Sequence, residues 1–425
     1  MAGNRTDILM NTLEKLQDAN AAVRARAVET LRRTLVPAAL AQHANVVVAL
    51  LEDTDANVRR EAVMTLHKLE RATLAQHANA VVAKLEHGNV CVSWSALDTL
   101  RKLDQVTLAQ HACAVAARLD DSDLRVRLAA LSTLFKLKPA VLAQYAGAMA
   151  ARLDDTNTRV RSAALQTLHK LNKATLSNHA DALVAMLSDS DSQVRSEALA
   201  TVGNLKLATL AQHADLVAAK LEDSDSKVRD RALSTLGKLK PAALAQYAGA
   251  VVARLEDSIT CVQSQALETL GKMEPATLAQ HANAVAAKLE DNVGEVRRRA
   301  LETLGKLNPA ALAQHADAVM ARLGDSWWYV RKKAVQTLRK LPRFVTHGVD
   351  FEAVALLIVY DQSAPRLLAL RSRLMGRLAW YKCRLRLRVE RLSLYWYALP
   401  YRPSGPGHAR DVAAWKQMNK RSRLV

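Results

Sequence analysis

The sequence is poor in the features on which disulfide-rich and membrane-spanning proteins depend. Cysteine occurs only at Cys91, Cys113, Cys261 and Cys383, which are far apart and form no CxxC pair. No apolar run reaches the roughly 18 residues that a membrane span needs, and the first residues lack the pattern of a signal peptide. We therefore expect reduced thiols and a cytoplasmic protein, with a nuclear location as the alternative.

Aromatic residues are also scarce, at 4% of the chain, whereas Leu, Ala and Val dominate. The net charge is +19 and unevenly placed, because residues 343–425 carry 16 Lys and Arg against 5 Asp and Glu. The same segment holds 10 of the chain's 17 aromatic residues. This composition separates it from everything before it.

The remainder of the chain is a repeat. After one step of 35 residues, a Val recurs every 34 residues from Val58 to Val330, and the His or Tyr of an LAQHA-like motif keeps the same interval from His43 to His315. Two markers in step over this distance indicate stacked units rather than separate globular domains. We predict ten units over residues 1–342 and a distinct, partly disordered segment or cap over 343–425.

Each unit contains two helical patterns. In residues 207–240 apolar residues recur with helical spacing over 209–221 and again over 226–238. An acidic turn lies between them, and Asp225 is a candidate N-cap of the second helix. The sequence therefore predicts an all-α fold, with a continuous first helix whose buried side includes His213 and Leu216.

An Asp and an Arg accompany most of the repeating Val residues, five positions before and one position after, as in Asp223 and Arg229. By helical phase the Arg lies at the edge of the apolar face, where it needs a carboxylate. The unit in which His87 replaces the Asp also has Ser93 in place of the Arg. This joint loss favours pairing of the two positions.

The pattern L-x-D-x-x-x-x-V-R-x-x-A-L-x-T-L resembles the HEAT repeat over about residues 6–341. Its short period is similar to the phycobilisome-lyase-like branch of that family. The resemblance implies a right-handed α-α superhelical solenoid of armadillo type, with about ten helix pairs and an Asp–Arg ladder. It also implies that the second helices line the concave side.

The His and Tyr row does not predict a catalytic or metal site. Stacked helices lie about 10 Å apart, so ligands in this row would not converge, and Tyr145 and Tyr247 are poor substitutes for an imidazole ligand. The sequence also lacks the His-Glu pairs of the family's di-iron hydroxylases. We predict a non-catalytic protein without metal or cofactor, in which the row forms a hydrogen-bonded stack between units.

A basic row follows the second helices, ten residues after the Val in nine of the units. It consists of Arg33, Lys68, Lys102, Lys136, Lys170, Lys238, Lys272, Lys306 and Lys340. Such cations complement a helix C-terminus, and they also suit an acidic protein partner. Exposed acids such as Glu61 and Asp98 on the same face disfavour nucleic acid as its ligand.

Four aromatic residues depart from the repeat. Trp94 takes a normally polar position on a second helix, while Trp327, Trp328 and Tyr329 replace the last turn between helices. We expect the latter three to cap the array. Exposed, they would form a binding hot spot.

The leading functional hypothesis is a scaffold that binds protein partners on its second-helix surface, with no small-molecule substrate. Residues 343–425 have three open interpretations: a helical cap, a basic arm for anionic membranes or nucleic acid, or an extension that is not native to the protein. A further alternative, implied only by the resemblance, is a bilin-lyase-like protein that acts on light-harvesting proteins.

Overall fold

The computed structural model describes residues 9–341, and every regular element within this range is a helix. Contacts between residues divide the whole chain into residues 1–342 and 343–425. The predicted C-terminal cap or arm over residues 343–425 therefore lies outside the described residues.

The longest helices are the second helices of the repeat units, and each follows a polar turn. Their bounds are α2 (Ala21–Thr34), α5 (Ala56–Leu66), α8 (Val90–Leu100), α11 (Leu124–Leu134), α14 (Thr158–His169), α17 (Ser192–Val202), α20 (Ser226–Leu236), α23 (Thr260–Leu270), α26 (Gly294–Leu304) and α29 (Trp328–Leu338). The predicted N-cap is confirmed at Asp225, whose side chain accepts from the backbone N–H groups of Lys227 and Val228. From α23 onward Ile259, Val293 and Trp327 take this position and provide no side-chain cap.

From α3 onward the first helix of each unit is broken into two short helices, so the prediction of a continuous helix over 209–221 is wrong. A three-residue 3-10 turn, such as η8 (Lys220–Glu222), follows the second of them. The pairs are α3 (Pro37–Ala41) and α4 (Ala44–Ala49), α6 (Arg71–Gln76) and α7 (Ala78–Ala83), α9 (Gln105–Gln110) and α10 (Ala112–Ala117), α12 (Pro139–Leu142) and α13 (Ala146–Ala151), α15 (Lys173–Ser177) and α16 (Ala180–Ala185), α18 (Leu207–Gln212) and α19 (Ala214–Ala219), α21 (Pro241–Leu244) and α22 (Ala248–Ala253), α24 (Pro275–Gln280) and α25 (Ala282–Ala287), and α27 (Pro309–Gln314) and α28 (Ala316–Ala321).

The break falls on the His or Tyr of the repeat. His213 has φ −109° and ψ 13°, outside the helical region, and its N–H bonds to the carbonyl of Leu210 three residues back. The break changes the helical phase of the residues that follow. Leu216, predicted to be buried, is consequently 52% exposed, whereas Val217 is fully buried.

The core consists of small and branched side chains that let second helices approach closely. An Ala is buried at the same position of every second helix: Ala27, Ala62, Ala96, Ala130, Ala164, Ala198, Ala232, Ala266, Ala300 and Ala334. The Thr three residues later donates to its own helix up to Thr201, and Thr133 also reaches Leu97 of the preceding second helix. From Thr235 onward it donates instead to a Leu carbonyl of the preceding second helix. At Gly203 the absence of a side chain leaves room for this approach, because a Cβ atom there would lie 3.3 Å from the Thr235 hydroxyl.

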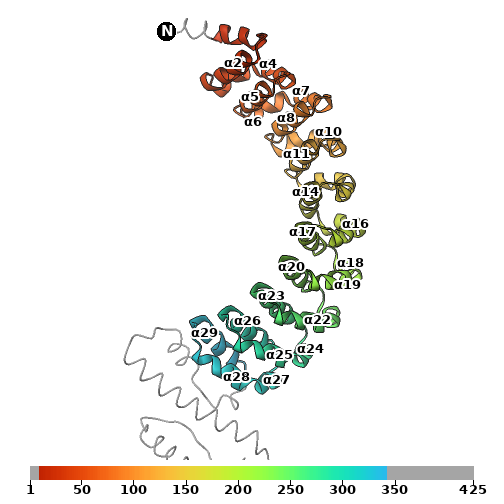
Figure 1. The fold of residues 1–425 in the computed structure, drawn as a ribbon, viewed down its shortest axis with the longest axis vertical. Coiled ribbons are helices and arrows are strands. Elements are labelled where there is room, and N and C mark those ends of the chain that lie inside the picture. The colour runs from red at the N-terminus through yellow and green to blue at the C-terminus, as the bar shows by residue number, and fades with distance from the viewer. Residues whose placement is uncertain (1–8, 342–425) are drawn as a thin grey trace, which may run out of the picture. The chain divides into compact units, whose positions relative to one another are not determined.

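The units follow one another in chain order, with the second helices in one row and the first helices in another (Figure 1). Neighbouring second helices pack on each other far more closely than neighbouring first helices do. The second helices therefore form the more tightly packed of the two rows. Within residues 9–341, no helix has both the length and the apolar character that a membrane crossing requires.

Candidate functional site

A ladder of Arg–Asp ion pairs joins consecutive units. Arg195 of α17 donates through Nη2 to Oδ1 of Asp223, in the turn before α20, at 2.7 Å. Five further pairs have N···O distances of 2.6–2.7 Å: Arg24–Asp53, Arg127–Asp155, Arg161–Asp189, Arg229–Asp257 and Arg297–Asp325. The ladder that the HEAT resemblance implies is therefore present, and each Arg pairs with the Asp of the following unit.

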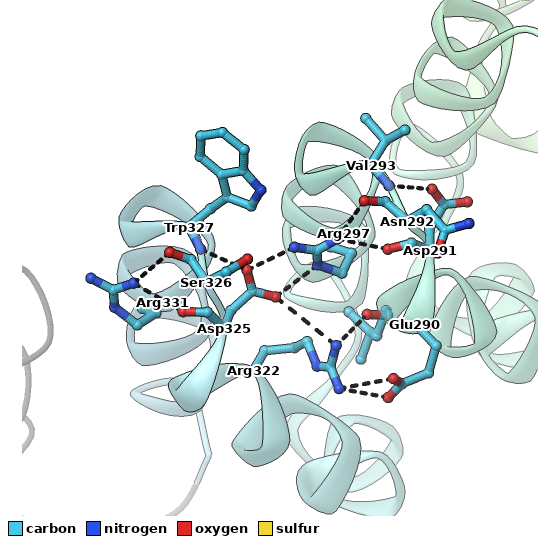
Figure 2. A network of polar contacts seen from close by, with 11 residues as sticks. Glu290, Asp291, Asn292, Val293, Arg297, Arg322, Asp325, Ser326, Trp327 and Arg331 are labelled. Atoms are coloured by element: carbon cyan, nitrogen blue, oxygen red, sulfur yellow. Dashed lines mark hydrogen bonds and ion pairs between the residues drawn. The ribbon is translucent and has the colours of Figure 1, made fainter.

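Each ladder Arg also binds its own turn. In Figure 2, Arg297 donates through Nη1 to the carbonyls of Asp291 and Asn292 at 2.7 and 3.1 Å, and through Nε and Nη2 to the Asp325 carboxylate at 2.7 and 2.8 Å. The guanidinium carries several donors in a fixed plane, so one side chain can hold two turns together.

Burial alone would raise the pKa of the Asp223 carboxyl. Hydrogen bonds from Arg195 and from the backbone N–H of Asp225, together with the positive charge of Arg195, outweigh that effect and hold this pKa below its ordinary value. The same balance lowers the pKa of the carboxyls of Asp53, Asp189, Asp257 and Asp325.

Two of the three gaps in the ladder lie around α8. His87 takes the place of an Asp, and its Nδ1 accepts from the N–H of Asn89 at 3.0 Å, as the Asp carboxylates do in other turns. Arg59, which is only 5% exposed, is thereby left with the backbone carbonyls of Asp53 and Thr54 and no ladder carboxylate.

The substitutes for Arg retain the bond within the unit and lose the bond between units. Ser93 donates to the carbonyl of His87 at 3.2 Å, and Gln263 donates to the carbonyl of Asp257 at 2.7 Å. Neither reaches the next turn, so Asp121 and Asp291 have no ladder Arg. Because pairing runs between units, the joint change of His87 and Ser93 removes two ion pairs rather than the single pair that the sequence pattern implied.

Most of the basic row caps helix ends. Lys68 donates through Nζ to the carbonyls of Arg32 and Leu35 at 2.6 and 2.7 Å, at the end of α2. Four other lysines donate in the same way to the end of the preceding second helix: Lys136 to Arg101, Lys170 to Phe135, Lys238 to Gly203 and Lys340 to Gly305. These ammonium groups satisfy carbonyls that a helix end leaves without a partner. The helix complemented is thus the preceding one, not the one that carries the lysine.

The remaining four members of the row differ from one another. Arg33 pairs with Glu29 at 2.8 Å, and Lys272 pairs with Glu268 at 3.1 Å. Lys102 and Lys306 have no hydrogen bond or ion pair among the described residues. The row is therefore not a uniform line of free cations, and its binding role stays a prediction.

Two members of the His and Tyr row are hydrogen-bonded to the preceding unit, so the predicted stack is seen only in part. Nδ1 of His77 lies 2.9 Å from Oδ1 of Asn45, and the Tyr247 hydroxyl donates to Asp215 at 2.8 Å. Burial, the hydrogen bond to Asp215 and the charge of Asp215 together raise the pKa of Tyr247 to about 12. Among residues 9–341, no group of three or more His, Cys, Asp and Glu side chains is placed to hold a metal ion.

A second set of ion pairs, at the ends of the first helices, was missed in the sequence. Each base reaches back to an acid of the preceding unit, opposite to the ladder: Lys84–Glu52, Arg152–Asp120, Arg254–Glu222, Lys288–Glu256 and Arg322–Glu290. The recurring tripeptides KLE and RLD were the available signal. The acids are largely exposed, so each pair contributes little.

A groove with a volume of about 620 Å³ crosses the second helices α5, α8, α11 and α14. Its lining includes His67, Arg101, Lys102, Phe135, Lys136 and Gln166. His67, Arg101 and Phe135 occupy the repeat position that is glycine in the four units from α17 to α26, at Gly203, Gly237, Gly271 and Gly305. At this repeat position, side chains therefore project from the second helices in the N-terminal units, whereas the units from α17 to α26 have none.

The face around the groove combines apolar and cationic side chains. Met64 of α5, Trp94 of α8 and Phe135 are 44%, 41% and 44% exposed. The Lys170 ammonium lies 4.3 Å from the centroid of the Phe135 ring, a cation–π contact. We call this surface, between α5 and α14, the groove face.

The four predicted aromatic residues do not form one patch, because Trp94 lies on α8 and the others lie at α29, with α11 to α26 between them. Trp327 and Tyr329 stack with ring centroids 5.6 Å apart, and Trp328 meets Tyr329 edge-on at 6.1 Å. A Cβ atom at Gly294 of the preceding unit would lie 2.7 Å from both the Trp327 ring and the Tyr329 hydroxyl. Trp327 and Tyr329 thus pack on α26, while Trp327 and Trp328 each remain 51% exposed.

No family model and no curated protein sequence matches the chain. An engineered protein of solved structure is 17% identical with a TM-score of 0.53, over 78% of this chain and 98% of its own. The karyopherin Kap121p is 15% identical with a TM-score of 0.55, over 89% of this chain and 46% of its own. In its complex with Pho4p, Kap121p is 14% identical with a TM-score of 0.56, over 85% of this chain and 44% of its own. The chain thus spans less than half the length of the karyopherin. Together with the stacked helix pairs, these similarities show that the chain has the fold of a HEAT-type helical-repeat solenoid.

Proposed function

We propose that this chain is an interaction scaffold that binds a protein partner on the groove face. The observation that carries the proposal is the coincidence, across α5 to α14, of a hollow with exposed apolar side chains and cations. Buried apolar and aromatic anchors with a polar surround are typical of binding hot spots. Kap121p, which shares the fold, has been solved with Pho4p and with the SUMO protease Ulp1p.

The polar groups of the groove favour binding over catalysis. Asp98 accepts from Arg101 at 2.6 Å, and His67 lies 3.2 Å from the backbone carbonyl of Asp98. Burial is the largest effect on His67 and lowers the pKa of its imidazole. These groups hold one another rather than converge on a reacting atom, and we propose no enzymatic activity.

The other candidate functions rest on less. The basic arm for membranes or nucleic acid belongs to residues 343–425, outside the described range. The bilin-lyase-like alternative rests on the family resemblance alone.

Site-specific photocrosslinking tests the proposal. A photoreactive side chain replaces the exposed Ser132 in the groove or, as the control, the exposed Leu216 on α19. We expect discrete protein adducts from position 132 and few from position 216. Equal adducts at both positions, or none from position 132, would contradict binding on the groove face.

A further inference from the structure

Building on the proposed function, we infer that the groove binds an extended acidic segment of the partner, with one large apolar side chain seated against the Phe135 ring. Phe135 lines the groove at the end of α11, together with Lys102 and Lys136. Three features support this inference: the excess of cations on the groove face, the length of the groove and the exposed apolar ring within it.

The acids of the groove face are already neutralised, while cations are in excess. Glu61 pairs with Arg32 at 3.0 Å, and Asp98 pairs with Arg101 at 2.6 Å. Lys102 has no such partner among the described residues. Lys136 is bound only to a backbone carbonyl, which leaves its charge uncompensated.

Further positive charge surrounds these two lysines. The charge of Arg71, at the start of α6, acts on both Lys102 and Lys136. Complementary charge steers a partner to its surface and selects against partners of like sign. An acidic ligand is therefore favoured here.

The dimensions of the groove favour an extended chain. It crosses four neighbouring helices, and three interhelical steps of about 8–10 Å give roughly 24–30 Å. An extended peptide of about nine residues covers that distance. The half-exposed Phe135 ring provides the apolar seat, and the Lys170 ammonium, 4.3 Å from the ring centroid, adds a cation beside it.

Charge also disfavours other ligands of the groove, namely the chain's own C-terminal segment, a second copy of the chain and nucleic acid. Residues 343–425 carry 16 Lys and Arg against 5 Asp and Glu, and the whole chain has a net charge of +19. The chain's own C-terminal segment and a second copy of the chain would thus bring like charge to the groove. Nucleic acid would place phosphates beside the carboxylates of Glu61 and Asp98, which an acidic peptide with spaced charges can avoid.

Synthetic peptides and the full-length chain test the inference by fluorescence anisotropy. The probe is a labelled peptide of about twelve residues, rich in Asp and Glu with one central Trp, and its analogue carries Asn and Gln instead. We expect Kd to rise about tenfold for the neutral analogue and for the Lys102→Glu chain. Lys306→Glu is the matched control. Lys306 occupies the same repeat position and equally has no partner among the described residues, but it follows Gly305 in the part of the array outside the groove face. The Kd of the acidic peptide for this variant should stay within about twofold of the value for the unmodified chain.

A double-mutant cycle tests the apolar seat. Phe135→Ala should weaken binding of the Trp peptide but not of the same peptide with Ala in place of Trp. Equal losses for both peptides would overturn the assigned seat.

Other outcomes would overturn the inference in distinguishable ways. Equal losses from Lys102→Glu and Lys306→Glu would mean diffuse attraction, and tighter binding of oligo(U) or of a peptide copying residues 366–378 would identify another occupant. If no acidic peptide binds while position 132 still crosslinks to a protein, the inference fails and the proposed function stands. Absence of both signals would remove both.

Discussion

Arg195 and Asp223 lie 28 residues apart in the sequence, yet their side chains meet at 2.7 Å and join α17 to the turn before α20. The same ion pair recurs between other units but is missing between α5 and α8, between α8 and α11, and between α23 and α26. The first two gaps fall between second helices that the groove face spans. The partner-binding surface that we propose therefore crosses two interfaces between units that lack the Arg–Asp ion pair.

Removing one ladder carboxylate should destabilise the array. Asp223→Ala leaves Arg195 half-buried without its partner, and we expect a loss of about 3 kcal/mol in the free energy of unfolding. Asp121→Ala is the control, since Asp121 accepts the same turn hydrogen bond but has no ladder Arg. Urea unfolding of both variants measures the difference, and equal losses would show that the ion pair contributes nothing.

Restoring a missing ion pair should stabilise the chain. His87→Asp would give Arg59 the carboxylate that other ladder arginines have, and we expect a gain of about 1 kcal/mol. His87→Asn can accept the same turn hydrogen bond without the charge, so it should gain much less. The thermal unfolding midpoints of the two variants distinguish these contributions. A similar gain for His87→Asn would mean that the turn hydrogen bond, and not the ion pair with Arg59, stabilises the chain.

The ladder also predicts how stability depends on pH. The pKa values of Asp53, Asp189, Asp223, Asp257 and Asp325 are lowered in the folded state. Their contribution is therefore complete above the unfolded value of about 3.9 and is lost as pH falls below it toward the lowered folded values. Urea midpoints measured between pH 6 and pH 3 should fall less steeply for Asp223→Ala than for the unmodified chain. Parallel curves would contradict this assignment.

The lysines that cap helices should matter for stability, and the free ones should not. Lys238→Met removes the hydrogen bond to the Gly203 carbonyl, and we expect a loss of about 1 kcal/mol. Lys306→Met removes no hydrogen bond or ion pair seen among the described residues and should be nearly neutral. Equal unfolding midpoints for the two variants would mean that the hydrogen bond from Lys238 stabilises the fold no more than a hydrogen bond from water to the same carbonyl.

The aromatic cluster at the start of α29 should require glycine at position 294. Gly294→Ala would put a methyl group 2.7 Å from the Trp327 ring and the Tyr329 hydroxyl, and we expect a loss of about 1–2 kcal/mol. Gly88→Ala, with no atom within 4 Å of the added Cβ, is the control. Adding Trp327→Ala to Gly294→Ala should recover part of the loss, whereas an additive loss would show that the two residues do not meet.

Local patterns predicted the helices, their caps and their buried positions. Asp225 caps α20, and Val228, Ala232, Leu233, Leu236 and Leu239 are buried as their spacing indicated. These features depend on contacts within three or four residues, which the sequence states directly. The continuous first helix was wrongly predicted, because apolar spacing does not reveal that His213 leaves the helical region.

The sequence by itself determined the period, the all-helical units and the existence of an Arg–Asp ladder. Only the tertiary structure decided that the ladder joins each Arg to the next unit, that most of the basic row caps the preceding helix, and that the groove opens between α5 and α14. Those contacts join residues 28 to 36 positions apart. They depend on the spacing and rotation of one helix pair against the next, which no pattern within a single unit encodes.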